Sequence, residues 1–285
     1  MKIHAIETGR VKITKNWQVG QDSGLGRLAN TLLDRRFTAW LPIYCWVVEH
    51  PEGLLVIDTG IPADANKPIF FPPFMPLVQR AAKFDIEPSE LIGPQMLALG
   101  LEPEAVRWVV QTHLHQDHDG GLGYFPNAEI IVSRVEWETA VGVKGRLGGY
   151  LNHRWPKWLQ PSLVEFEAEP LASFASHYTL TEAGDVILVP TPGHSQGHLS
   201  VIVKDGDLSY LFAGDVSYTE QHLLNGTADG VAVAPEQQLD TQKRIVAYAQ
   251  KHPTVYLPSH DPEGKQRLES ASIVPVYEAS RSKVG

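Results

Sequence analysis

One short segment of the chain, 112–118, concentrates side chains that bind divalent metals. It reads Thr-His-Leu-His-Gln-Asp-His and follows an apolar run. Borderline cations such as zinc prefer imidazole nitrogen and carboxylate oxygen as ligands. If the apolar run is a strand, extended backbone places His113 and His115 on one face, and the turn that follows sends Asp117 and His118 another way. The segment could therefore serve two metals. The alternative is a solvated, histidine-rich loop that binds metal only loosely.

Three later segments repeat this order, an apolar run followed by a loop with a ligand-type side chain. The side chains in these loops are His194, Asp215 and His260. Each alone could be an ordinary loop residue. Together with the first segment they supply five histidines and two aspartates, enough for two metals with a water or hydroxide between them and open positions for substrate.

Strands and helices are expected to alternate around these loops. A first hairpin should turn at Gly9, and Ser89 should cap a helix that stops at Gly100. Ser133, with Glu136 three residues later, should cap another helix. The expected strands are 2–8, 10–14, 42–48, 54–58, 107–111, 128–132, 186–189, 199–203, 209–212 and 254–257, and the expected helices are 89–99, 133–141 and 235–251.

Composition limits the classes of function. The chain has 285 residues, 43% of them hydrophobic and 20% charged, which is ample for a buried core. A net charge of -9 argues against a nucleic-acid partner and favours a neutral substrate. The N-terminus lacks the apolar stretch of a signal peptide and 39–48 is too short to cross a bilayer, so we expect a soluble, cytoplasmic protein. Cys45, the one cysteine, looks like a small core residue.

These motifs, together with the segment 54–60, resemble the metallo-β-lactamase superfamily, and the resemblance extends over most of the chain. It implies an α/β fold of the four-layer αββα type. We expect one domain over 1–285, with an N-terminal excursion at about 20–40 and loops rich in aromatic residues and proline at about 61–80 and 145–161. The excursion could contact substrate or a second subunit in a homodimer.

The same resemblance implies the ligand sets and the cofactor, two divalent ions, with Zn²⁺ preferred and Co²⁺, Mn²⁺ or Fe²⁺ as alternatives. Asp58 would orient a ligating histidine, although a strand-terminal turn residue is the alternative. One metal would take His113, His115 and His194, the other would take Asp117, His118 and His260, and Asp215 would bridge them.

Three known branches of the superfamily fit this sequence poorly. Class B β-lactamases often use a cysteine ligand, and Cys45 lies in the wrong place. Glyoxalase II carries a C-terminal helical domain, for which the tail after His260 leaves no room. RNA-processing nucleases prefer a basic exosite, which does not suit an acidic chain. Hydrolases of small esters and lactones remain.

A tyrosine points to lactones in particular. Tyr218 stands three residues after Asp215, as in the N-acyl-homoserine lactonases that this segment resembles. It would aim its hydroxyl at the substrate carbonyl, although a packed tyrosine at a helix start is the alternative. The expected reaction is opening of the lactone ring by a metal-bridging hydroxide, after which Asp117 carries a proton to the leaving alkoxide. Position 119 is an aspartate, where the resemblance implies a small residue.

The acyl chain of such a substrate needs an apolar groove. The proposed walls come from the two aromatic loops: Phe70, Phe71, Phe74, Met75, Tyr150, Trp155 and Trp158. Two other functions stay open: a broad carboxylesterase or phosphodiesterase of the same fold, and a metal-binding sensor or diiron oxidoreductase, for which no flavin module is visible.

Overall fold

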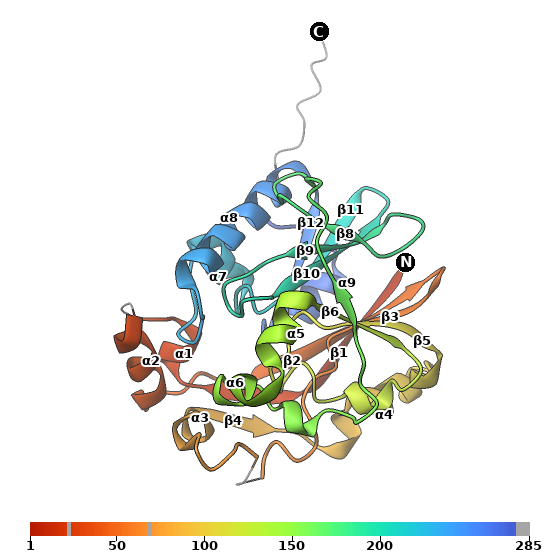
Figure 1. The fold of residues 1–285 in the computed structure, drawn as a ribbon. Coiled ribbons are helices and arrows are strands. Elements are labelled where there is room, and N and C mark those ends of the chain that lie inside the picture. The colour runs from red at the N-terminus through yellow and green to blue at the C-terminus, as the bar shows by residue number, and fades with distance from the viewer. Residues whose placement is uncertain (22–23, 68–69, 278–285) are drawn as a thin grey trace.

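The computed structural model describes residues 1–21, 24–67 and 70–277. The predicted excursion and the first aromatic loop therefore each include two residues outside the described ranges, 22–23 and 68–69. Two β-sheets face each other, and helices cover both outer sides (Figure 1). The predicted αββα fold is confirmed. No helix within the described ranges is long and apolar enough to cross a membrane.

In the described part of the chain the first sheet has seven strands and the second has five. The first contains, in spatial order, β4 (Ala82–Asp85), β1 (Lys2–Ile13), β2 (Leu41–His50), β3 (Gly53–Ile57), β5 (Val106–Val110), β6 (Glu129–Ser133) and β7 (Ser162–Val164). The second contains β12 (Thr254–Pro258), β11 (Leu208–Gly214), β10 (Leu199–Asp205), β9 (Val186–Pro190) and β8 (Tyr178–Thr179).

Short and long helices connect these strands. The α-helices are α1 (Lys15–Gln18), α2 (Gly24–Leu33), α3 (Pro76–Ala81), α4 (Ile92–Ala98), α5 (Arg134–Ala140), α6 (Gly142–Leu147), α7 (Glu220–Asn225), α8 (Pro235–Lys251) and α9 (Gly264–Glu269). Single 3₁₀ turns are η1 (Pro88–Glu90), η2 (Pro103–Ala105), η3 (Leu122–Tyr124) and η4 (Asn152–Arg154).

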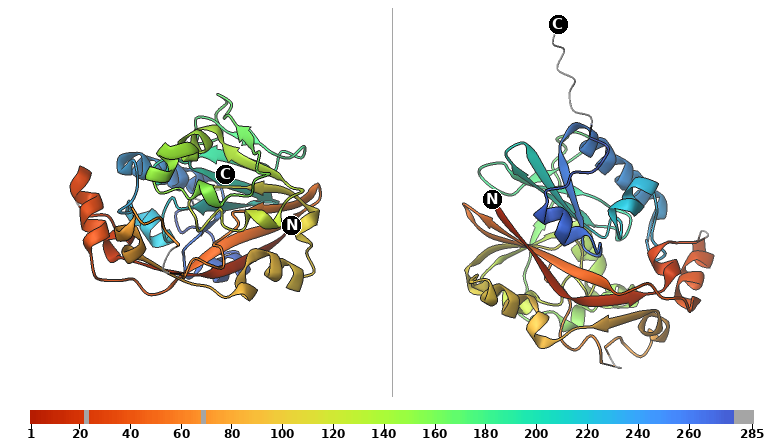
Figure 2. Two further views of the ribbon diagram at one scale, coloured as in Figure 1. Left: turned by 60° about the horizontal axis from the view of Figure 1, so that its bottom comes forward. Right: turned by 180° about the vertical axis from the view of Figure 1, so that it is seen from behind.

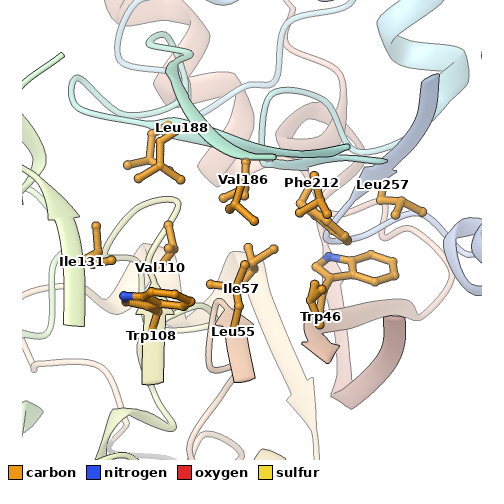
Figure 3. Packing of buried hydrophobic residues seen from close by; sticks show 14 of the residues in the cluster. Trp46, Leu55, Ile57, Trp108, Val110, Ile131, Val186, Leu188, Phe212 and Leu257 are labelled. Carbon is orange, nitrogen blue, oxygen red and sulfur yellow. The ribbon is translucent and has the colours of Figure 1, made fainter. Parts of the chain in front are cut away.

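The core lies between the two sheets. Strand side chains alternate between faces, so every second residue of the central strands points inward. Trp46, Leu55 and Val110 of the first sheet meet Leu188 and Phe212 of the second, and all five are buried (Figure 3). The alternate residues of the same strands pack outward, under α4 and α5 on one side and α8 on the other (Figure 2).

Strand direction brings the ligand loops to one edge. β3 and β5 are parallel, as are β11 and β12. β9 and β11 both run antiparallel to β10, so β9 shares the direction of β11. The carboxyl ends of β9, β11 and β12 therefore lie at the same edge. Leu199 N donates to Thr112 O at 2.9 Å, which joins this edge to the loop after β5.

The predicted turn at Gly9 is wrong. β1 is one strand that pairs with β2 along most of its length and with β4 near its end, and its register against β2 shifts between Glu7 and Arg10. Gly9 has φ 83°, and a Cβ there would lie 2.8 Å from Asp85 O. The glycine permits a bulge within the strand, not a reversal of the chain.

The predicted helix over 89–99 is divided. Leu91 is extended, with φ -62° and ψ 150°, and separates η1 from α4. Proline is tolerated only in the first turn of a helix because it lacks an N–H, so Pro94 requires α4 to begin close before it. Glu87, not Ser89, forms the cap of η1.

The helix α5 begins at the predicted place with Ser133 at the N-cap position, but the predicted capping bond is absent from this described segment. Ser133 makes no side-chain cap bond. Glu136 is fully buried and points toward the ligand loops instead. The remaining predicted strands and α8 agree with the structure to within a few residues.

Candidate metal centre

Seven side chains from four loops converge at this edge of the sheets. Three overlapping groups have ligand atoms within 4.8 Å of one another. These groups are His113, His115 and His194; His113, His118 and Asp215; and Asp117, His118 and His260. The structure therefore brings together every ligand candidate taken from the sequence.

The polar atoms in these groups fit a cation better than they fit one another. His113 Nε2, His118 Nε2 and Asp215 Oδ1 are buried and have no hydrogen-bond partner in the described part of the chain. Buried polar atoms are nearly always paired, so several unpaired nitrogen and oxygen atoms around one point indicate a site for a further partner. His115 Nδ1 and His194 Nε2 also face each other at 3.0 Å. Imidazole and carboxylate around such a point suit a divalent metal.

Asp215 lies between two clusters of histidine. Its Oδ1 is 3.4 Å from His118 Nε2 and 3.3 Å from His260 Nε2. Its Oδ2 is 3.5 Å from His194 Nε2. One oxygen thus faces each cluster, which is the arrangement required of a bridging carboxylate. Asp117 approaches only one cluster, with 3.7 Å between its Oδ2 and His260 Nε2.

Burial and mutual charge set the protonation of the histidines. Burial, with His118 nearby, holds the pKa of His113 well below its usual range, so this ring is neutral and free to ligate. Burial also acts against protonation of His118 and His194, but neighbouring carboxylates outweigh it. Asp215 and Asp58 raise the pKa of His118, and Asp229 raises the pKa of His194 to about 9.

Asp58 holds the first ligand loop. Its carboxylate accepts bonds from His118 Nδ1 at 2.8 Å, from Thr112 N at 2.8 Å and from Thr112 Oγ1 at 2.8 Å. Thr112 Oγ1 also lies 3.1 Å from His113 Nδ1. Partners of this kind fix which ring nitrogen of a histidine faces the metal.

Two further ligands, His194 and His260, have supports that the sequence did not indicate. His194 Nδ1 lies 2.9 Å from Asp229 Oδ2, and Gln238 Nε2 donates to the same oxygen at 2.6 Å. His260 Nδ1 donates to Pro42 O at 2.9 Å. No local pattern marks Asp229 or Pro42, since each lies far from its histidine in the chain.

Glu136 bonds to two of the ligand loops, the one after β5 and the one after β9. Its carboxylate accepts from Leu114 N at 3.1 Å, Ser195 Oγ at 2.7 Å, Gly197 N at 3.1 Å and Tyr150 OH at 3.1 Å. Burial raises the pKa of Glu136, and these four donors oppose the rise. Its spacing, three residues after Ser133, predicts a helix cap and does not reveal this role.

His198 supports the bridging carboxylate through the backbone. Its Nε2 accepts from Asp215 N at 3.1 Å, while its Nδ1 bonds to Thr191 Oγ1 at 2.9 Å. Burial, with His194 nearby, lowers the pKa of His198 to about 3, so the ring stays neutral. The spacing of four residues after His194 was the signal that could have found it.

Asp119 is buried beside the ligand loop but belongs to none of the three ligand groups. It accepts from Trp155 Nε1 at 2.5 Å, and burial raises its pKa to about 7. The next residue in the chain, Gly120, has no room for a side chain, because a Cβ would lie 2.3 Å from Pro62 Cδ. Asp119 thus ties the loop to Trp155.

Tyr218 lies against the ligand His260. The two rings stack, with 5.3 Å between centroids and an interplanar angle of 25°. The tyrosine is buried, and burial together with Asp215 holds its pKa well above its usual range. The hydroxyl therefore keeps its proton and can donate a hydrogen bond.

A cavity of about 350 Å³ opens onto these groups. Its polar end contains His115, Gln116, Asp117, His194, Asp215, Tyr218 and His260. Its apolar walls are Val11, Ile13, Trp17, Leu28, Leu32, Phe71, Met75, Val78, Ala82, Phe84, Leu147, Val231 and Val233, and the backbone of Gly148 and Gly149 completes it. One wall thus comes from α1, just before the predicted excursion, and from α2 within it.

Of the residues predicted to form the walls, Phe71 and Met75 line this cavity. Phe70 packs into the core beside them, and Phe74 is 58% exposed on a separate hollow. The second aromatic loop reaches the cavity through α6 and the glycines after it. Its own aromatic residues lie elsewhere: Tyr150 contacts His115 and Glu136, Trp155 stacks on Trp137, and Trp158 is 40% exposed.

Known proteins share this sequence and architecture. N-acyl homoserine lactonase AiiA of Bacillus thuringiensis subsp. kurstaki is 29% identical over 83% of this chain and 87% of its own length. A probable metallo-hydrolase of Mycobacterium tuberculosis is 32% identical over 76% of this chain and 74% of its own. A solved N-acyl homoserine lactone hydrolase with N-hexanoyl-L-homoserine at its catalytic metal centre superposes with a TM-score of 0.76, 25% identity and coverage of 97% of this chain and 98% of that one.

The family profile described as the metallo-beta-lactamase superfamily matches residues 38–260, well over half of the chain. The match begins before β2 and ends on the ligand candidate His260. The αββα layers and the strand-end loops that carry the seven side chains agree with it. The chain belongs to the metallo-β-lactamase superfamily.

Proposed function

We propose that this chain is a dinuclear metal-dependent hydrolase that opens the ring of N-acyl-homoserine lactones. The single observation that carries the proposal is the cavity, whose walls are apolar and whose end combines Asp117, Asp215 and His260 with the hydroxyl of Tyr218. An amphiphilic substrate with a reactive carbonyl at one end and an acyl chain at the other fits this division. The likeness to AiiA over most of both chains supports the same substrate class.

The residues that would hold the metals are the two ligand sets named above, with Asp215 between them. We propose zinc as the metal, because imidazole and carboxylate together suit it, and cobalt, manganese or iron would accept the same set. Two such cations, when bound, supply a water nucleophile at neutral pH and polarise the substrate carbonyl.

Tyr218 would bind the carbonyl oxygen. Stacking on His260 fixes its ring, and its raised pKa keeps the hydroxyl as a donor. During water addition the carbonyl oxygen becomes anionic, so a donor aimed at it stabilises the transition state more than the ground state. One such donor is worth about 3 kcal/mol of barrier.

Asp117 would move the proton. Its side chain is 15% exposed and lines the cavity, while the other carboxylate of the centre, on Asp215, is 5% exposed. Water adds to the carbonyl carbon, the ring C–O bond breaks, and the alkoxide so formed needs the proton that water gave up. A carboxylate within the cavity can accept that proton and deliver it, giving the acyl-homoserine with its free carboxylate.

Gln116 would recognise the amide of the acyl group. It is the one uncharged amide side chain among the described residues that line the cavity, and it stands between His115 and Asp117. A secondary amide entering an apolar cavity loses its bonds to water, so a donor or acceptor beside it reduces that loss.

An assay of acid release at constant pH tests the proposal. The protein is loaded with zinc and given N-hexanoyl- and N-decanoyl-homoserine lactone, bis(4-nitrophenyl) phosphate and a simple thioester. We expect kcat/KM to be highest for the lactones. Faster turnover of the phosphodiester or the thioester would overturn the lactonase proposal and favour the broader hydrolase.

A further inference from the structure

The segment 228–234, here called the strap, lies against the ligand loop that carries His194. Asp229, on the strap, accepts from His194 Nδ1 at 2.9 Å, and Ala234 N donates to Gly193 O at 3.0 Å. Gln238, at the start of α8, donates to Asp229 Oδ2 at 2.6 Å. Asp229 and His194 are each 2% exposed, so the position of the strap sets the orientation of the ligand.

The other side of the strap contacts α1, α2 and Gly20 between them, here together called the helical excursion, which lie beside it at the edge of the sheets (Figure 1). Gly230 N donates to Trp17 O at 2.7 Å, and Gly20 N donates to Ala228 O at 3.0 Å. Thr31 Oγ1 of α2 lies 3.2 Å from Gly230 O. The strap is therefore bonded on one side to a metal-ligand loop and on the other to the wall of the cavity.

Arg27 of α2 is the charged residue in this contact. It is 8% exposed, and its Nε donates to the backbone oxygen of Asp229 at 3.0 Å, with a second bond from Nη2 to the same oxygen. A buried guanidinium is costly unless it is paired. Burial lowers the pKa of Arg27, and the negative charge of Asp229 opposes that change.

The fit between strap and excursion leaves no space for added atoms. A Cβ on Gly230 would lie 2.0 Å from Asn16 O and 2.2 Å from Thr31 Oγ1. Within the excursion itself, a Cβ on Gly20 would lie 2.2 Å from Arg27 Nη2, the group that bonds to the strap. By contrast, an added Cβ on Gly26 of α2 meets none of the described residues within 4 Å. The close approach of the strap to α1 and α2 therefore requires glycine at position 230.

We propose that Arg27 is a positioning residue that ties the apolar wall of the cavity to the metal ligand His194. The excursion supplies Trp17, Leu28 and Leu32 to that wall, and Arg27 grips the backbone of the residue whose side chain orients His194. That the wall receives an acyl chain rests on the proposed function; the link from Arg27 to His194 does not. Coupling between two sites is reciprocal. Binding of the metals therefore stabilises the excursion, and loosening of the excursion lowers the affinity for the metals.

Metal affinity tests this link without any assay of turnover. Arg27→Gln removes the guanidinium, and Arg35→Gln, an exposed position after α2, makes the same change in charge away from the strap. Zinc affinity is measured by competition with a chromophoric chelator. We expect Arg27→Gln to bind the more weakly held zinc about tenfold less tightly, at the lower end of the range for groups that support a ligand. We expect Arg35→Gln to match the unmodified protein.

Hydrogen exchange gives a second readout. Zinc loading should slow exchange of the amides of Gly20 and Gly230 in the unmodified protein and in Arg35→Gln, but not in Arg27→Gln. If Arg27→Gln fails to fold, Gly230→Ala against Gly26→Ala repeats both measurements, since only the former introduces a clash with the excursion.

Equal zinc affinity in Arg27→Gln and Arg35→Gln, or amides at Gly20 and Gly230 that do not respond to zinc in the unmodified protein, would overturn the proposal. The outcome is separate from that of the lactonase assay. If no lactone is hydrolysed but Arg27→Gln loses zinc affinity, the proposed substrate is wrong and the role of Arg27 stands.

Discussion

The carboxylate of Asp58 and Nδ1 of His118 lie 2.8 Å apart, and both side chains are 1% exposed. Because Nδ1 bonds to Asp58, Nε2 is the ring nitrogen that faces Asp215, and it has no hydrogen-bond partner among the described residues. Asp58 itself has φ 57°, a left-handed conformation that aspartate tolerates better than most residues. The end of β3 thus fixes the orientation of a ligand on the loop after β5.

Replacing Asp58 by Asn should weaken metal binding. An amide has only one acceptor oxygen for His118 and Thr112 together, so the ring loses its fixed orientation. We expect zinc affinity to fall about 10- to 100-fold. Competition with a chelator measures it, with Asp207→Asn, at an exposed position, as the control. Equal affinities in the two variants would show that Asp58 is only a turn residue.

Tyr218→Phe should lower kcat while leaving the metals in place. Phenylalanine keeps the ring that stacks on His260 and removes only the hydroxyl. Loss of one donor to a developing oxyanion lowers kcat by roughly a hundredfold. Steady-state kinetics and metal analysis of the same sample give both quantities. An unchanged kcat would assign Tyr218 to packing.

Leu28 and Leu33 form a matched pair on α2. Leu28 lines the cavity and is 48% exposed, whereas Leu33 is 55% exposed and is not among its lining residues. Leu28→Ala should raise KM for N-decanoyl-homoserine lactone about fivefold, from about 1 kcal/mol of lost apolar contact, and should change KM for the N-butanoyl substrate little. Leu33→Ala should change neither value. A similar rise for both substrates in Leu28→Ala would remove this wall from the acyl site.

Glu136→Ala should destabilise the fold. Removal of its carboxylate leaves the amides of Leu114 and Gly197 buried without an acceptor, which costs about 3 kcal/mol or more. Chemical denaturation measures the free energy of unfolding. Glu138→Ala, at an exposed position on the same helix, is the control and should differ little from the unmodified protein. Comparable stability of both variants would contradict the structural role of Glu136.

Local patterns predicted the parts of the site that are local. The ligand loops follow apolar strands directly, so residue type and strand period were enough to find His113 and Asp215. The αββα layers followed from a resemblance carried by the same loops. Asp229 could not be found in this way, because it meets His194 across 35 residues of chain and no spacing marks the pair.

Glycine, proline and aromatic residues were less informative about the local structure. Gly9 predicts a turn and permits a bulge, since both need a positive φ. Pro94 moves the start of α4, a constraint that hydrophobic period alone does not include. Phe71 and Phe74 have the same side chain three residues apart, yet one lines the cavity and the other is exposed. Which face an irregular loop presents depends on tertiary packing.

The number of metals bound at full activity tests the central claim most directly. The protein is stripped with a chelator, and zinc is returned in steps while bound zinc and lactone hydrolysis are measured in the same samples. The seven converging side chains predict that activity is lost on stripping and returns in full at two zinc ions per chain. Activity that survives complete removal of metal, or that is full at one ion per chain, would contradict a dinuclear centre.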